Sequence, residues 1–60
     1  MKTNVVTITS VTGRNVSYTG NDWDGCDINQ FPDTPEVGDK YEITEELGLI
    51  VSIEKLLTNL

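Results

Sequence analysis

The densest group of polar side chains in the sequence is Asp22-Trp23-Asp24-Gly25-Cys26-Asp27. Its carboxylates are hard oxygen ligands of the kind that Ca²⁺ prefers, so this segment is a candidate cation site. The helix–loop–helix calcium loop requires glycine at its sixth position and glutamate at its twelfth. Counted from Asp22, those positions hold Asp27 and Asp33. The spacing leaves at most a weak, adventitious cation site, and we expect no metal or other cofactor.

Cys26 is the only cysteine in the 60 residues, and no histidine is present. Within this sequence, a disulfide framework, a Cys/His zinc site and a histidine-based catalytic triad are therefore excluded. A reactive thiolate needs nearby positive charge to lower the thiol pKa, whereas neighbouring carboxylates raise it. We expect an inert, half-buried thiol, and a free thiol is typical of a reducing compartment.

Carboxylates can also act as general acids or as nucleophiles when a cleft moves their pKa values apart. The interior of a small β-barrel is filled by its own side chains, which leaves little room for such a cleft. We therefore expect a protein that is not an enzyme.

Trp23 is the only tryptophan and admits two interpretations. In the first, its ring covers one end of the core while its indole N–H bonds a loop carbonyl. In the second, it is exposed and anchors a partner, since Trp and Tyr dominate binding hot spots. Its neighbours Asn21, Asp22, Asp24 and Gly25 are polar or turn-forming, which suits an exposed loop tip.

Charge is distributed unevenly along the chain, which carries ten acidic and four basic residues and a net charge of −6. Lys2 and Arg14 give residues 1–20 a charge of +2, whereas residues 21–60 hold all ten acids and two lysines, a charge of −8. Phosphate binding draws on Lys and Arg, so a nucleic-acid partner is disfavoured. The acids form either a solvated, solubilising surface or a patch that steers a basic protein partner.

The first predicted hairpin joins strands over residues 4–12 and 15–19, which are rich in Val, Ile and Thr. A two-residue turn at Gly13-Arg14, with glycine first, fixes the register of the two strands. The pairs that it predicts are Thr12 with Asn15, Val11 with Val16, and Thr9 with Tyr18.

The second predicted hairpin joins residues 41–45 and 49–54, which alternate apolar and polar side chains except at Ile50. A three-residue loop over 46–48, with Gly48 left-handed, would keep the apolar side chains on one face. A two-residue turn at Leu47-Gly48 would turn one apolar row toward solvent, so the longer loop is favoured. The pairs that it predicts are Ile43 with Val51 and Tyr41 with Ile53.

Residues 20–39 would make an implausibly long loop in so small a domain, so we predict a third strand within them. A turn at Gly20-Asn21 would pair Tyr18 with Trp23, an aromatic cross-strand contact. We favour this register over a turn at Asp24-Gly25. That alternative would pair Tyr18 with Phe31 but would also set two like charges face to face, those of Asp22 and Asp27.

Three segments outside the hairpins have their own signals. Residues 31–35 contain two prolines and are expected to form an irregular connection, followed by a turn at 37–39 into the fourth strand. Near the end of the chain, Leu56, Leu57 and Leu60 have the spacing of a short helical turn over an open barrel end, or of an end that packs on a second copy. No run of about 18 apolar residues is present, so we expect no membrane contact.

Five short antiparallel strands with regular turn signals indicate an all-β fold, a single small barrel domain over residues 1–60. The candidates are an SH3-like barrel and a shortened OB-like barrel, closed or nearly closed. The absence of alanine and the abundance of Thr, Val and Ile argue against helix bundles.

The segment Phe31-Pro32…Val37-Gly38-Asp39-Lys40-Tyr41-Glu42-Ile43, followed by a glycine-turned strand, resembles many short bacterial and phage small-barrel domains. In those domains a proline and then Gly-Asp lead into the later hairpin. The resemblance covers roughly half the chain. It implies the small-barrel fold and a prokaryotic or viral origin, and it implies no function.

Our leading functional hypothesis is a small acidic protein-binding module that acts on a protein with a basic surface. One version is a phage or mobile-element inhibitor of a host nucleic-acid-binding protein, located in the bacterial cytoplasm. The residues expected to contact the partner are Asp22, Trp23, Asp24, Asp27, Phe31, Glu45 and Glu46.

Two other functions are carried as alternatives. A nucleic-acid-binding barrel would stack bases on Tyr18, Trp23 and Phe31 beside the two N-terminal cations, Lys2 and Arg14. A structural or assembly component would form homo-oligomers, because a small core gains stability by burying surface against a neighbour. Its contact residues would be Leu56, Leu57 and Leu60.

Overall fold

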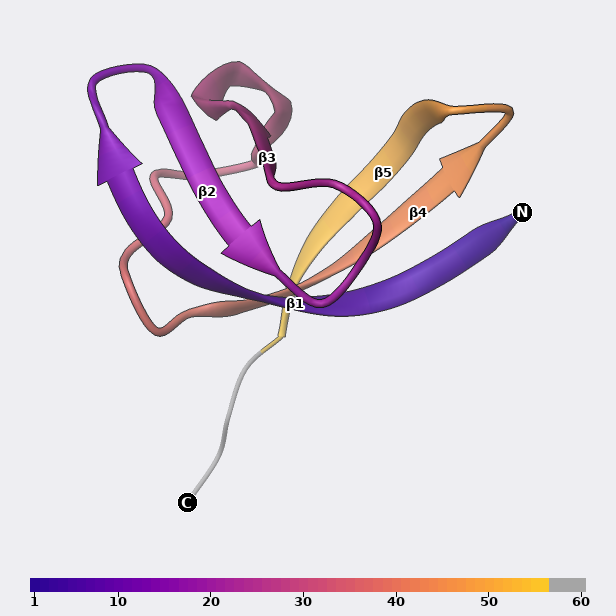
Figure 1. Cartoon of the computed structure of the whole chain (residues 1–60), viewed down its shortest axis with the longest axis horizontal. Coiled ribbons are helices and arrows are strands. Elements are labelled where there is room, and N and C mark those ends of the chain that lie inside the picture. The colour runs from indigo at the N-terminus through magenta and orange to yellow at the C-terminus, as the bar shows by residue number, and fades with distance from the viewer. Residues whose placement is uncertain (57–60) are drawn as a thin grey trace.

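The computed structural model describes residues 1–56, which fold into five strands and one short 3₁₀-helix (Figure 1). The elements are β1 (Lys2–Thr12), β2 (Asn15–Thr19), β3 (Gly25–Asp27), η1 (Ile28–Gln30), β4 (Lys40–Glu46) and β5 (Leu49–Leu56). All pairings are antiparallel, in the order β3-β2-β1-β4-β5. The prediction of an all-β fold with five antiparallel strands is confirmed, and the sheet curls into a half-barrel with β3 and β5 at its two edges.

The long strand β1 lies at the centre of the sheet, between β2 and β4. Its first part, from Lys2 to Thr7, pairs with β4, and its second part, from Thr7 to Thr12, pairs with β2. A β-bulge lies between Ile8 and Ser10, where the register with β2 shifts by one residue. Bulges bend and twist a strand, so this one helps to curl the sheet.

The first hairpin has the predicted turn, with Thr12 opposite Asn15 and Val11 opposite Val16. The predicted pairing of Thr9 with Tyr18 is wrong, because Tyr18 lies opposite Ile8. The bulge explains the difference. Ile8 and Val11 are three residues apart, and only an extra residue between them lets both face the core.

The concave face of the half-barrel holds the core. Its buried hydrophobic residues are Val6, Ile8, Val16, Tyr18, Phe31, Tyr41, Ile43 and Ile53. The ring of Phe31 packs edge-on against Tyr41, with ring centroids 5.0 Å apart at 80°. The Tyr41 hydroxyl also donates a hydrogen bond of 2.8 Å to Asp33, which ties the irregular connection after Phe31 to the core.

The second hairpin is confirmed, but its predicted loop is wrong. Glu46 pairs with Leu49, so the turn is the two-residue Leu47-Gly48, with φ of 54° and 78°. Two successive positive φ angles are those of a type I′ turn, whose twist matches that of the strands. The register then shifts between Thr44 and Glu45, leaving Val51 as an extra residue on β5.

That shift produces pairs that differ from the predicted ones. Ile43 lies opposite Ile53 instead of Val51, and Tyr41 lies opposite Lys55 instead of Ile53. The bulge keeps both Ile50 and Ile53 on the core side while allowing the shorter turn, which a strand without a bulge would exclude.

A third strand does lie within residues 20–39, but both predicted registers for it are wrong. Val16 pairs with Cys26 and Ser17 with Gly25, and the Tyr18 N–H bonds the carbonyl of Asp24. The register differs by one residue from the favoured pairing of Tyr18 with Trp23. The reason is a longer connection over residues 20–24, in which the Asn21 side chain accepts a hydrogen bond from the Trp23 N–H.

The segments that follow β3 agree with the remaining expectations in part. Residues 31–35 are irregular, and a turn at Val37-Gly38 leads into β4, both as predicted. The helix η1 was not predicted. Leu56 is the last residue of β5 and not part of a helical turn, and Leu57 and Leu60 lie outside the described residues.

Candidate functional site

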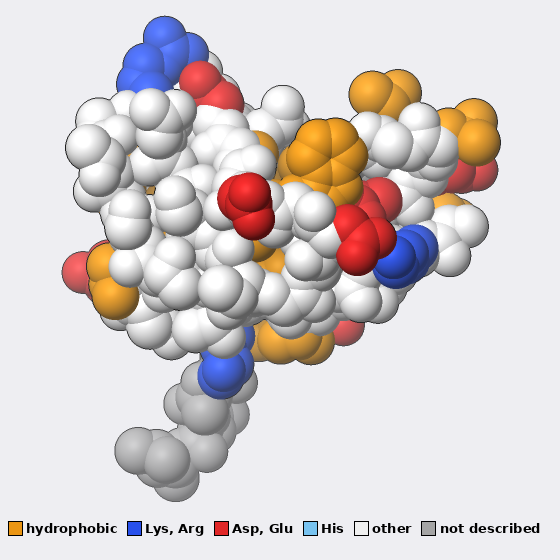
Figure 2. Space-filling view, viewed as in Figure 1, with side chains coloured by type: hydrophobic (Ala, Val, Ile, Leu, Met, Phe, Trp, Pro, Cys, Tyr) orange, Lys and Arg blue, Asp and Glu red, His pale blue; other side chains and the backbone are white. Residues whose placement is uncertain are grey.

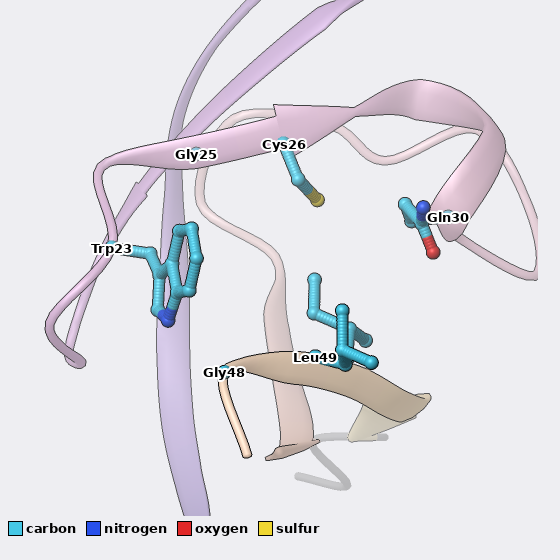
Figure 3. Close-up of a pocket in the computed structure, with 7 residues that line it drawn as sticks. Trp23, Gly25, Cys26, Gln30, Gly48 and Leu49 are labelled. Carbon is cyan, nitrogen blue, oxygen red and sulfur yellow. The ribbon is translucent and has the colours of Figure 1, made fainter. Parts of the chain in front are cut away.

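A cleft of about 490 Å³ lies at the opening of the half-barrel, between its two edge strands (Figure 3). One wall comes from β3 and the segments around it, and the other from the start of β5. The lining residues are Trp23, Gly25, Cys26, Gln30, Gly48, Leu49 and Ile50. In Figure 3 the side chain of Cys26 points from β3 into the cleft, and Leu49 lies on the facing wall. We call these residues, together with Leu47 at the adjoining turn, the seam surface.

Trp23 stands at the mouth of the cleft and is 44% exposed. Its backbone is fixed by the hydrogen bond of 2.9 Å from its N–H to Asn21. The preceding Gly20 has φ of 128°, and a Cβ there would lie 2.3 Å from the Val5 carbonyl oxygen. Only glycine therefore fits where the connection crosses β1. Of the two interpretations of Trp23, the structure agrees with the second, in which the side chain is exposed at a loop tip.

Two exposed leucines lie on the other side of the opening, Leu49 on the cleft wall and Leu47 at the adjoining turn, and neither was among the predicted site residues. Leu47 is 96% exposed and Leu49 is 71% exposed, on either side of Gly48. Leu47 is also the only non-glycine residue with positive φ among residues 1–56. The sequence did contain a signal for Leu47. A type I′ turn favours Asn-Gly or Asp-Gly, so leucine as the first residue of such a turn is unusual.

Acidic side chains border the seam surface. Asp22 and Asp24 flank Trp23, Asp27 ends β3, and Glu46 precedes the Leu47 turn. Figure 2 shows acidic side chains gathered beside exposed hydrophobic ones on the face that carries the opening. None of these four predicted site residues lines the cleft itself, but each is next in sequence to a residue of the seam surface, and we call them the acidic rim.

Two members of the acidic rim have cationic neighbours. The Lys2 ammonium lies 2.9 Å from Asp22 and, by donating a hydrogen bond, lowers the pKa of that carboxyl group. An Arg14 guanidinium nitrogen lies 3.5 Å from Asp27. All four side chains are largely solvent-exposed, and exposed pairs contribute little to stability. A partner can therefore compete with both pairs at small cost.

Two other predicted site residues lie in the interior and not on this surface. Phe31 is 7% exposed and belongs to the core beside Tyr41. Glu45 is also 7% exposed, and its Oε2 atom is buried without a hydrogen-bond partner among the described residues. The spacing carried a signal for this, because Glu45 continues the inner row of Tyr41 and Ile43, but its charge suggested an exposed position.

Cys26 lines the cleft, and its chemistry follows from its surroundings. Burial raises the pKa of its thiol, and the carboxylate of Asp27 raises it further. Burial likewise raises the pKa of the nearby Tyr18 hydroxyl to about 12. Both groups are therefore protonated at neutral pH, so the cysteine that lines the cleft is a thiol rather than an activated nucleophile.

Comparison with known proteins adds no relative to this description. No family model, curated protein or solved structure matches the chain. Within residues 1–56, no helix is long and apolar enough to cross a membrane. Over the same residues, no three His, Cys, Asp or Glu side chains form a group that could hold a metal ion. The seam surface and its acidic rim are therefore the features that bear on function.

Proposed function

We propose that this protein is a small protein-binding module that holds a basic partner against the seam surface. The observation that carries the proposal is a tryptophan, 44% exposed, at the mouth of an apolar cleft and flanked by carboxylates. Binding sites of this kind combine an aromatic anchor, a concave apolar surface and a polar rim.

The apolar part of the surface supplies the affinity. Trp23, Leu47 and Leu49 expose large side chains around one opening, where their burial by a partner would remove apolar area from water. Single exposed hydrophobic residues are common on any protein, but a group of them around a cleft is typical of an interaction site.

The acidic rim supplies selectivity for a basic partner. Carboxylates next in sequence to the seam surface on both sides of the opening, together with the net charge of −6, attract cationic surfaces and repel acidic ones. An inhibitor that occupies the basic surface of a nucleic-acid-binding protein in the bacterial cytoplasm is one specific form of this function. It would imitate the charge of the nucleic acid that its target binds.

The same observations disfavour the nucleic-acid-binding alternative. Of the three aromatic residues expected to stack on bases, Tyr18 is 2% exposed and Phe31 is 7% exposed. The two cations expected beside them, Lys2 and Arg14, lie next to aspartates. Trp23 is left as one stacking platform inside a ring of negative charge.

The proposal is tested by affinity capture from an extract of the source cells. The seam variant combines Trp23→Ala with Asp22→Asn, Asp24→Asn and Asp27→Asn. The charge-matched control carries Glu36→Gln, Glu42→Gln and Glu54→Gln, which change three acids outside the acidic rim. We expect the native protein and the control to retain the same basic protein in about 50 mM salt and to release it in about 500 mM.

The seam variant is expected to retain none of that protein. Equal retention by the seam variant and the native protein would contradict the proposed surface. Retention of an acidic protein, or retention that does not change with salt, would contradict the proposed role of the acidic rim.

A further inference from the structure

We infer that the partner is held by strand addition: an extended segment of the basic protein lies in the cleft and pairs through its backbone with β3. The inference rests on the proposed function and states how the partner is bound. It follows from the direction in which the backbone groups of β3 point, from what lines the cleft beside them, and from the charge of its rim.

The direction of the β3 backbone groups is fixed by two hydrogen bonds to β2 and the turn before it. The Tyr18 N–H donates to the Asp24 carbonyl at 2.9 Å, and the Ile28 N–H donates to the Arg14 carbonyl at 2.8 Å. In an antiparallel ladder, alternate residues bond the same neighbour. Cys26 therefore bonds β2, and Gly25 and Asp27 turn their backbone groups away from it.

Three of those outward groups lie on the free edge of the sheet. They are the N–H and C=O of Gly25 and the N–H of Asp27, since β3 has no other neighbouring strand among the described residues. The Asp27 carbonyl is not counted, because Asp27 is the N-cap residue of η1, where the chain leaves the strand. An added strand would bond these groups, as strands do when they extend a sheet.

The cleft provides a place for such a strand. Gly25 and Cys26 line one wall, and Gly48, Leu49 and Ile50 line the facing wall across the opening. Free edges in soluble proteins are often blocked by lysine or proline, and β3 has neither. The edge next to the cleft is short but open to a partner's backbone.

Charge and side-chain alternation define the occupant. An added strand would direct alternate side chains into the apolar cleft and the others toward the acidic rim. A segment that alternates β-branched and basic residues would place its apolar side chains in the cleft and its basic side chains next to the acidic rim. A second copy of this chain fits poorly, because it would bring acidic residues against the acidic rim of a molecule with net charge −6.

The first test uses a capped peptide of about six residues that alternates valine and arginine. The control peptide has the same sequence with every backbone amide N-methylated, which keeps its charge and removes its donors. Trp23 is the only tryptophan, so its fluorescence reports binding. We expect the control to bind about tenfold or more weakly, and amide exchange at Gly25 and Asp27 to slow when the first peptide binds.

The second test places a proline on the edge of β3. Asp27 has φ of −70°, which proline adopts, and its N–H is not bonded to β2, so Asp27→Pro is compatible with the fold. Asp27→Ala is the matched control, because it loses the same carboxylate and the same cap on Asn29 but keeps the N–H. We expect Asp27→Pro to bind the peptide about tenfold more weakly than Asp27→Ala.

The outcomes separate this inference from the proposed function. Equal binding of the two peptides, with exchange at Gly25 and Asp27 unchanged, would overturn strand addition and leave a partner held by side chains. Failure of both peptides to change Trp23 fluorescence would count against the proposed function as well. If Asp27→Pro does not fold, the comparison of the two peptides still decides.

Discussion

Two residues in this protein depart from what stability alone would favour, one at the turn beside the opening and one in the interior. Leu47 has a backbone conformation that leucine rarely adopts and exposes nearly all of its side chain. Glu45 has a carboxylate oxygen in the interior with no partner among the described residues. Each costs free energy of folding, and each yields a prediction.

Replacing Leu47 with asparagine should stabilise the fold and weaken binding. Asparagine tolerates positive φ, and a left-handed leucine costs about 1 kcal/mol, so the free energy of unfolding should rise by about that amount. The exposed side chain loses no packing within the protein, but a partner would lose an apolar contact. Chemical denaturation measures the first effect, and titration with the captured partner measures the second. Unchanged affinity would remove Leu47 from the seam surface.

Replacing Glu45 with methionine should also raise the free energy of unfolding, by about 1 kcal/mol. Methionine has a similar length and removes a buried polar atom that lacks a hydrogen-bond partner. Denaturant unfolding compares the variant with the native protein, and Glu46→Met, at an exposed position, is the control. A lower stability for Glu45→Met would show that the carboxylate has a favourable interaction in the interior.

Cys26 should react slowly with alkylating reagents in the folded protein. Burial raises its pKa, so at any pH below that pKa the thiolate fraction is smaller than in the unfolded chain. Because the folded state favours the protonated thiol, Cys26 makes a favourable contribution to the free energy of unfolding. This contribution is complete below the pKa of the thiol in the unfolded chain, and it is lost as the pH rises through the pKa of the thiol in the folded protein. Alkylation rates with iodoacetamide, measured from neutral to alkaline pH with and without denaturant, check this. Equal rates in both states would contradict it.

At the scale of elements, two β-bulges decide how the hairpins are built. Ile8 and Val11 on β1, and Ile50 and Ile53 on β5, are pairs of apolar residues three positions apart. A strand alternates its side chains with a period of two, so both members can face inward only if one residue is extra. Regular strands without bulges would give the predicted pairs Thr9 with Tyr18, Ile43 with Val51 and Tyr41 with Ile53, and for that reason these three predictions were wrong.

Gly25 should be the residue on which the attachment of β3 depends. A Cβ at this position would lie 2.1 Å from the Val16 carbonyl oxygen, which is backbone and cannot move aside cheaply. Gly25→Ala should therefore lower the free energy of unfolding by about 2 kcal/mol or more and increase amide exchange in β3. Gly13→Ala is the control, because it meets no atom within 4 Å and adds only the strain of its positive φ. Similar losses in both variants would contradict the close approach.

At the scale of the whole molecule, the sheet is an open half-barrel whose edges are not paired with each other. The composition was sufficient to predict five antiparallel strands, because β-branched residues and turn signals are local properties. The opening could not be predicted, since it depends on how far the bulges curl the sheet. The cleft, with Leu49 on one wall and Leu47 at the adjoining turn, follows from that global curvature, whereas Trp23 and the acidic rim were found from local composition.

The central claim is that a basic partner contacts the seam surface and its acidic rim. The most direct measurement is an NMR titration of the isotope-labelled protein with the captured partner, at low and at high salt. We expect amide shifts to change at residues 22–27 and 46–50 in about 50 mM salt, and these changes to disappear in about 500 mM. Shift changes confined to the convex face of β1 and β4, or changes that persist at high salt, would contradict the claim.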